Sequence, residues 1–267
     1  MRRHFHKMHG LGNDFVIVDA RETPFEVTPA LARAIADRRT GVGCDQLIVL
    51  EPSDSADLKM RIWNSDGGEV ESCGNATRCV IQLAGVRTID SDGGLLKGED
   101  FGAEVEVALP EPRFGWEEIP LAYAMDTAAV PMAWDGLEQP FAVNVGNPHL
   151  VFFVPDALEV PLEELGPRIE NDPAFPERIN VNVGTYVHNV LKLRTFERGA
   201  GETPACGTGA CASAVATIAT KRASSPVRVD MTGGSLTVAW EPGQPIRMRG
   251  PATHVFEGEL DLEALLQ

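Results

Sequence analysis

Alternation of apolar and polar residues is the strongest local signal along this chain, and it predicts mainly β structure. Between Glu104 and Leu109 the side chains of Val105, Val107 and Leu109 fall on one face of an extended segment. The same pattern predicts strands at residues 15–19, 46–50, 58–63 and 104–109 in the first half, and at 141–145, 149–154, 190–196, 227–231 and 236–240 in the second.

Helical periodicity is confined to a few segments. Thr28 followed by Pro29 is typical of a helix start, and this helix is expected to run from Ala30 to Arg39 before Gly41 ends it. Further helices are predicted at residues 76–84, 162–169 and 210–222. A proline-rich linker at 110–115 divides the 267 residues into two predicted domains, 1–112 and 113–267, with the last residues able to return to the first domain.

Two short motifs, a Gly-Asn dipeptide and a cysteine followed by glycine, each occur twice with nearly the same separation. The dipeptides Gly12-Asn13 and Gly146-Asn147 lie 134 residues apart, and Cys73 and Cys206, each followed by glycine, lie 133 apart. A shared offset predicts two copies of a strand-rich unit, each wrapped about a central helix. Such copies would face each other across a cleft.

A short glycine-containing turn leads from each cysteine of this repeat into a predicted helix. The first amides of a helix have no internal partners and carry about +0.5 of a charge, which stabilises an anion beside them. A free cysteine has a pKa near ~8.5, and this value falls at a helix start. Cys73 and Cys206 are therefore predicted to pass between thiol and thiolate near neutral pH, as an acid and a base would.

Inert, metal-binding and disulfide roles are the alternatives for these thiols. Neither corner has the C-x-x-C spacing of a zinc or redox site, and a total of five cysteines leaves one unpaired in any disulfide framework. The remaining cysteines, Cys44, Cys79 and Cys211, are interpreted as structural.

Composition limits the partners. A net charge of −16, from 23 basic and 39 acidic residues, argues against nucleic acid or an anionic membrane. The N-terminus lacks a signal-peptide pattern, and no run approaches the roughly 18 apolar residues of a membrane span. We expect a cytoplasmic protein, whose thiols stay reduced.

Ordered motifs along nearly the whole chain carry a resemblance to a known family. They are Lys7-Met8-His9-Gly10-Leu11-Gly12-Asn13-Asp14-Phe15, Gly41-Val42-Gly43-Cys44-Asp45-Gln46, Asn64-Ser65-Asp66-Gly67, Cys73-Gly74-Asn75, Gly146-Asn147-Pro148-His149, Glu197-Arg198-Gly199-Ala200-Gly201-Glu202-Thr203 and Cys206-Gly207-Thr208-Gly209. In this order they resemble the diaminopimelate epimerase family.

The resemblance implies an α/β (α+β) fold of two pseudo-repeated domains, each a curved, mostly antiparallel sheet wrapped around a central helix, with the active site in the cleft between them. It implies epimerisation of LL-diaminopimelate to the meso form, in lysine and peptidoglycan-precursor biosynthesis, by a cysteine thiolate/thiol pair. No cofactor and no metal is expected at this site. A homodimer is also implied, although Phe256 stands where some relatives use a tyrosine in the dimer contact.

The resemblance also assigns residues. Cys73 and Cys206 match the proton-transfer pair, and His149 and Glu197 match positions that assist it. Substrate-binding positions are matched by Asn13, Gln46, Asn64, Gly74, Asn75, Asn147, Asn180, Glu197, Arg198, Gly207 and Thr208. Asn182 is the alternative to Asn180, and the Arg198 fork suits the distal carboxylate of the substrate.

Other interpretations stay open at this point. His149 could make a satisfied structural contact, and any single asparagine could serve a turn. A related cysteine-pair racemase of histidine or proline would differ only in the pocket for the far end of the substrate. A phenazine-type isomerase of similar fold would lack the cysteine pair, a non-catalytic binding module would gain nothing from two ionisable thiols, and no lysine lies in a setting that suits a pyridoxal-dependent racemase.

Overall fold

The computed structural model describes residues 2–71 and 73–265, which form two compact units. Unit 1 extends to Val107 and also contains the C-terminal segment from Gly250, and unit 2 is Ala108–Arg249. The sequence places the boundary at 112/113. The boundary between the two units lies a few residues earlier, and the C-terminal segment is in unit 1 because its strand β19 (Thr253–Asp261) pairs with β1 (Arg2–Gly10).

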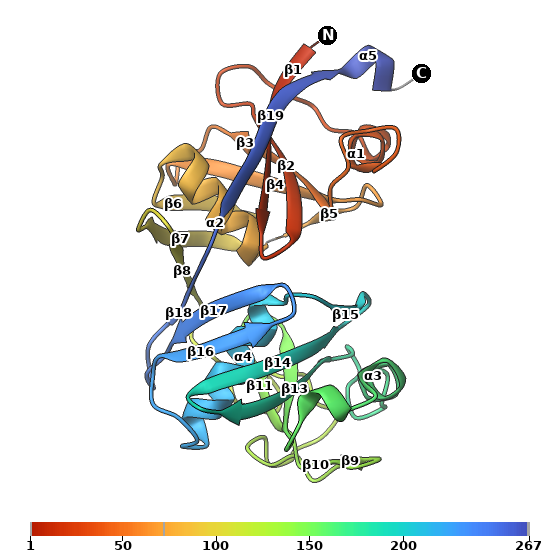
Figure 1. The fold of residues 1–267 in the computed structure, drawn as a ribbon, viewed down its shortest axis with the longest axis vertical. Coiled ribbons are helices and arrows are strands. Elements are labelled where there is room, and N and C mark those ends of the chain that lie inside the picture. The colour runs from red at the N-terminus through yellow and green to blue at the C-terminus, as the bar shows by residue number, and fades with distance from the viewer. Residues whose placement is uncertain (1, 72, 266–267) are drawn as a thin grey trace. The chain divides into compact units, whose positions relative to one another are not determined.

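Unit 1 is a mixed sheet with two main helices (Figure 1). Besides β1 and β19, its elements are β2 (Asn13–Asp19), α1 (Pro29–Ala36), β3 (Gln46–Glu51), β4 (Leu58–Asn64), β5 (Glu69–Val70), α2 (Gly74–Ala84), β6 (Thr88–Ser91), β7 (Gly94–Asp100), β8 (Val105–Leu109) and the short α5 (Leu262–Leu265). β1 lies antiparallel to both β19 and β2; β2 is parallel to β3, β3 antiparallel to β4, and β4 parallel to β6.

Unit 2 contains β9 (Ala133–Trp134), β10 (Leu137–Glu138), β11 (Phe141–Asn144), β12 (Pro148–Phe153), a short 3-10 turn η1 (Ala157–Glu159), α3 (Leu162–Glu170), β13 (Asn180–Val187), β14 (Val190–Glu197), β15 (Gly201–Thr203), α4 (Gly207–Ala219), β16 (Val227–Met231), β17 (Gly234–Ala239) and β18 (Ile246–Gly250). β11 is antiparallel to β12, β12 parallel to β13, β13 antiparallel to β14, and β14 parallel to β16.

This pairing order repeats that of unit 1 strand for strand. In each unit the second strand of a hairpin is parallel to the next strand, which is antiparallel to the strand that follows it (β4 or β14). After a short strand and the central helix, the chain returns in a strand parallel to β4 or β14. In each unit that helix touches strands from distant positions in the sheet: α2 contacts β1, β2, β19 and β7, and α4 contacts β11 to β14, β16 and β17. The predicted repeat, with each mostly antiparallel sheet wrapped around a central helix, is confirmed.

The two central helices are held differently. Residues Gly209–Thr217 of α4 are all buried, which small side chains such as Ala210, Ala212 and Ala214 permit. Helix α2 begins beside the end of β1, where a Cβ on Gly10 would lie 3.2 Å from the Asn75 Cβ. The β1–β2 turn that follows has positive φ at both Leu11 and Gly12, as a two-residue type I′ hairpin requires.

Helix boundaries differ slightly from the sequence expectation. Thr28 caps α1 as predicted, its Oγ1 accepting from the Leu31 amide at 3.2 Å, but the helix ends at Ala36 rather than Arg39. The Asp37 carboxylate there accepts from the amides of Arg39 and Thr40 and turns the chain. Over the described residues, no helix has both the length and the apolar character that crossing a membrane requires.

Candidate active site

In unit 1 Cys73 is the N-cap residue of α2, with an extended backbone that directs the chain into the helix. The first intrahelical hydrogen bond runs from the Thr77 amide to the Cys73 carbonyl at 2.9 Å. The amides of the first turn therefore lie open at the helix start, as the sequence predicts. Cys73 is half-buried and its Sγ lies 3.7 Å from the Asn13 Oδ1.

The Asn13 side chain is fixed from two sides. Its Nδ2 donates to the Asp45 carboxylate at 2.9 Å, and its Oδ1 accepts from the Asn75 Nδ2 at 3.2 Å. The Oδ1 of Asn75 in turn accepts from the fully buried Arg78 guanidinium at 2.9 Å. Three of the predicted residues, Asn13, Cys73 and Asn75, are thus brought into one cluster.

A second pair of amide side chains lies where β3 begins and the neighbouring strand β4 ends. Gln46 on β3 and Asn64 on β4 are cross-strand partners, and the Gln46 Nε2 donates to the Asn64 Oδ1 at 2.9 Å. The Oε1 of Gln46 is buried with no hydrogen-bond partner among the described residues. A buried acceptor in this state offers a place for the ammonium group of a ligand.

In unit 2 Cys206 occupies the same position at the start of α4. Its Sγ accepts from the Gly209 amide at 3.3 Å and lies 3.5 Å from the Thr208 Oγ1. Gly209 is required here, because a Cβ would lie 2.6 Å from the Asn182 Oδ1 and 2.7 Å from the Thr195 Oγ1.

The pKa of Cys206 corrects the sequence expectation. The helix start was expected to lower it, but burial raises the pKa of this thiol well above its usual value, and the negative charge of Glu197 raises it further. The Glu197 carboxylate is itself held by a hydrogen bond donated by the Thr203 hydroxyl. Desolvation and the neighbouring carboxylate outweigh the helix start, and Cys206 is a thiol at neutral pH.

His149, on β12, is fully buried and bonded at both ring nitrogens. The Asn182 Nδ2 lies 3.1 Å from Nδ1, and Nε2 lies 2.9 Å from the Asn147 Oδ1. Burial, assisted by the charge of Arg198, lowers the pKa of His149 to about 3, so the ring is neutral. Since an amide nitrogen faces Nδ1, the ring proton resides on Nε2 and is donated to Asn147.

Asn182, the alternative candidate, forms part of this network and not of an open surface. Its Nδ2 also donates to the Leu150 carbonyl at 2.8 Å, and its Oδ1 accepts from the Thr195 hydroxyl at 3.0 Å. Asn180 bridges two backbone segments, donating to the Pro148 carbonyl at 2.8 Å and accepting from the Arg198 amide at 3.0 Å. Asn180 therefore fixes the backbone that carries Arg198.

Several residues of the site were not singled out from the sequence. Arg78, Asp45, Thr195 and Thr203 each hold a predicted residue in place. Asp45 and Thr203 lie in the motif blocks that carry the resemblance, and Arg78 lies three residues after one of them, so their positions were available as a signal. Thr195 had none, because in sequence it is one polar residue of an alternating strand.

The other three cysteines are buried, which agrees with their interpretation as structural residues. Burial raises the pKa of Cys79 to about 12 and that of Cys44 to about 11, so both stay protonated. Cys211 is fully buried inside α4.

Solved structures with this doubled sheet-and-helix architecture define the class. A phenazine biosynthesis protein of the PhzF family from Bacillus anthracis matches with a TM-score of 0.69 at 18% identity, covering 97% of this chain and 99% of its own. A hydroxyproline epimerase from Agrobacterium vitis, solved with bound trans-4-hydroxy-L-proline, matches with a TM-score of 0.62 at 13% identity, covering 97% and 92%. The chain therefore has the fold of these phenazine biosynthesis and epimerase proteins.

Sequence similarity narrows the class to one family. The profile of diaminopimelate epimerase matches residues 5–98 and 141–255. A diaminopimelate epimerase from Rhizorhabdus wittichii is 62% identical over 267 residues, covering 99% of this chain and 97% of the relative. The chain belongs to the diaminopimelate epimerase family and is an isomerase.

The charge of Glu197 generates a prediction for Cys206. In Glu197→Gln the negative charge is lost, the pKa of Cys206 falls toward its ordinary value, and at a fixed mildly alkaline pH its alkylation by iodoacetamide becomes severalfold faster. Peptide mass spectrometry at Cys206 measures the rate. Glu163→Gln on α3 makes the same charge change without this proximity and should leave the rate unchanged; equal rates in both variants would refute the assigned cause.

Proposed function

We propose that this chain inverts one α-carbon of LL-2,6-diaminopimelate to give the meso isomer, with Cys73 and Cys206 as the two proton-transfer groups. The observation that carries this proposal is the pair of cysteines at N-cap positions of equivalent central helices. A two-base inversion needs one group to remove the α-proton and a second to deliver a proton to the opposite face. No cofactor takes part in this scheme.

The unequal surroundings of the thiols give the resting state. We assign the resting thiol to Cys206, which is buried beside Glu197, and the resting thiolate to Cys73, which is the N-cap residue of α2. The Cys73 thiolate takes the α-proton and the Cys206 thiol then gives its own proton to the carbanion. Afterwards Cys73 releases the proton it took up to solvent and Cys206 takes up a proton from solvent, which its raised pKa favours; these two steps restore the resting state.

The carbanion intermediate needs stabilisation, because an amino-acid α-hydrogen is far less acidic than a thiol. The amides of Gly74-Asn75 and Gly207-Thr208 stand at the two helix starts. If these amides hold the substrate carboxylate next to the reacting carbon, the two helix N-termini stabilise the negative charge that moves into that carboxylate when the proton is removed.

Polar side chains around the corners are assigned to substrate recognition. The buried Oε1 of Gln46, paired through its amide nitrogen with Asn64, suits an ammonium group. Arg198 is assigned to the distal carboxylate, with Asn180 fixing its backbone. Asn13 and Asn147 are also assigned to substrate binding, and His149, neutral and bonded at both nitrogens, acts as a positioning residue that orients Asn147.

Solvent deuterium tests the reaction and its two groups. Reduced protein incubated with LL-diaminopimelate in D2O should yield meso product with deuterium at the inverted carbon, while histidine and proline stay unchanged. Cys73→Ala and Cys206→Ala should each lower kcat by roughly 10²–10⁴-fold or more, because each removes the group on one face. Each variant should still exchange the α-hydrogen of only one stereoisomer.

Matched controls for these variants lie on the same helices. Cys79→Ala on α2 and Cys211→Ala on α4 remove buried thiols with no proposed catalytic role and should keep turnover near that of the parent. Full epimerisation by Cys73→Ala or Cys206→Ala would contradict the mechanism. Exchange with histidine or proline but not diaminopimelate would keep the mechanism and overturn the substrate.

The assignment of Arg198 predicts a change in substrate binding. Arg198→Ala should raise KM by roughly 10- to 100-fold, since a hydrogen bond to a charged group contributes about 1.5–3 kcal/mol, and Arg198→Lys should recover only part of this loss. Arg168→Ala, which removes a surface arginine paired with Asp135, is the control. A large drop in melting temperature with unchanged KM would make Arg198 structural instead.

A homodimer is proposed together with the activity, working in the cytoplasm where thiols stay reduced. On β19 the side chains of Val255 and Phe256 are 53% and 47% exposed, an apolar pair that suits burial against a second copy. Light scattering at micromolar concentration should give twice the chain mass, and Phe256→Asp should reduce it. A chain mass of one copy in the parent would refute the dimer.

A further inference from the structure

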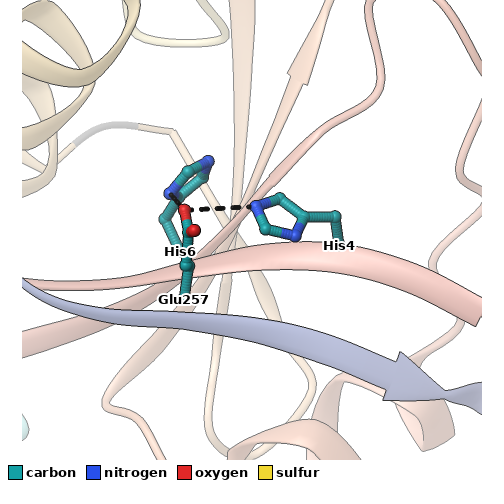
Figure 2. Close-up of side chains that lie close together, drawn as sticks. All are labelled: His4, His6 and Glu257. Carbon is teal, nitrogen blue, oxygen red and sulfur yellow. Dashed lines mark ion pairs between the residues drawn. The ribbon is translucent and has the colours of Figure 1, made fainter.

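Four metal-ligating side chains gather on the ladder formed by the first and last strands of unit 1. His4 and His6 come from β1, and His254 and Glu257 come from β19 (Figure 2 shows His4, His6 and Glu257). None of them belongs to either cysteine corner. We propose that they form a binding site for a divalent transition-metal ion, of which Zn²⁺ fits best.

The spacing of the ligand atoms matches a tetrahedral ion. Zinc–nitrogen and zinc–oxygen bonds of about 2.0–2.2 Å place neighbouring ligand atoms roughly 3.3–3.5 Å apart at tetrahedral angles. The His6 Nδ1 lies 3.2 Å from the His254 Nε2 and 3.6 Å from the Glu257 Oε2. The His4 Nε2 lies 3.5 Å from the same carboxylate oxygen, so three edges of the tetrahedron already have the required length.

Strand geometry explains why these four residues share one face. His4 and His6 are two residues apart on β1, and Glu257 is the cross-strand partner of His6. Regular pairing would then place His254 on the opposite face. A bulge between Lys7 and Met8 shifts the register, so that Met8 pairs with His254 and Val255 is the extra residue. The bulge turns the His254 ring to the face of His6.

Charge and exposure also suit a metal. Glu257 supplies one negative charge. The side chains of His4 and Glu257 are 55% and 60% exposed, which leaves a path from solvent. A set of three imidazoles and one carboxylate binds Zn²⁺ in preference to Mg²⁺ or Ca²⁺, which prefer oxygen ligands.

A bound ion would join the two ends of the chain. β1 and β19 lie side by side and carry the N- and C-terminal segments of unit 1 (Figure 1). Two ligands on each strand make the ion a cross-link that stabilises this ladder. Phe256 pairs with Lys7, so its side chain points to the other face, and metal binding does not compete with the proposed dimer surface.

Zinc titration of the intact, reduced protein by calorimetry tests the site. One Zn²⁺ per chain should bind to the parent, and His6→Gln and Glu257→Gln should each weaken this binding by more than about tenfold, since even outer-shell changes cost 10- to 100-fold. Matched controls are His188→Gln, on the turn after β13, and Glu259→Gln, which faces His4 on the same ladder but pairs with Arg2. Both should bind as the parent does. Mg²⁺ should not bind at comparable concentration.

The parent and the four variants contain the same cysteines, so zinc bound by thiols contributes equally to each titration. Differences in zinc affinity among these proteins therefore measure the proposed site on β1 and β19. Hydrogen exchange provides the second measurement: Zn²⁺ should slow exchange in residues 253–261 of the parent and not of His6→Gln. Circular dichroism of the metal-free variants checks that they fold. Equal zinc affinity in the parent, His6→Gln and Glu257→Gln, or no zinc-dependent protection of β19, would overturn the proposal.

Discussion

The candidate site depends on one constraint: each cysteine must be the last extended residue before a buried helix begins. Cys73 and Cys206 both satisfy it, and the open amides of α2 and α4 then lie beside each sulfur. The wrapped sheets hold these helices rigidly, because α4 is buried over most of its length and α2 meets strands from distant positions in its sheet. Positioning of the reactive groups therefore comes from the scaffold and not from loops.

Equivalent positions in the two units carry different side chains, and in unit 2 this side chain changes the proton affinity of the cysteine. Where unit 1 has Asn64 at the end of β4, unit 2 has Glu197 at the end of β14, 133 residues further on. An amide brings no charge, whereas the carboxylate raises the pKa of Cys206 in addition to the effect of burial. One architecture used twice thus places its two cysteines in different electrostatic surroundings.

The sequence predicted the fold well where the signals were local. The two corners, the helix start at Thr28 and most central strands followed from periodicity and capping, and the shared 133–134 offset predicted the repeat. Strand β19 was not predicted, because its polar residues interrupt the alternation and pairing with β1 makes it extended. Strand β13 was also missed, although residues 180–183 alternate between asparagine and valine. The lowered pKa expected for Cys206 was wrong, since burial and the approach of Glu197 depend on tertiary structure.

Buried polar networks explain why single-residue signals in the sequence were ambiguous. Asn180 and Asn182 are two residues apart on one strand and look interchangeable, yet Asn180 fixes the backbone of Arg198 while Asn182 fixes the tautomer of His149. A hydrogen bond from such an amide to a buried neighbour fixes the orientation of that neighbour. The neutral His149 ring, held between two amides, then transmits that constraint to Asn147. In this way a residue too deeply buried and too weakly basic to take up a proton still contributes to the site, by fixing the side chain that the substrate would meet.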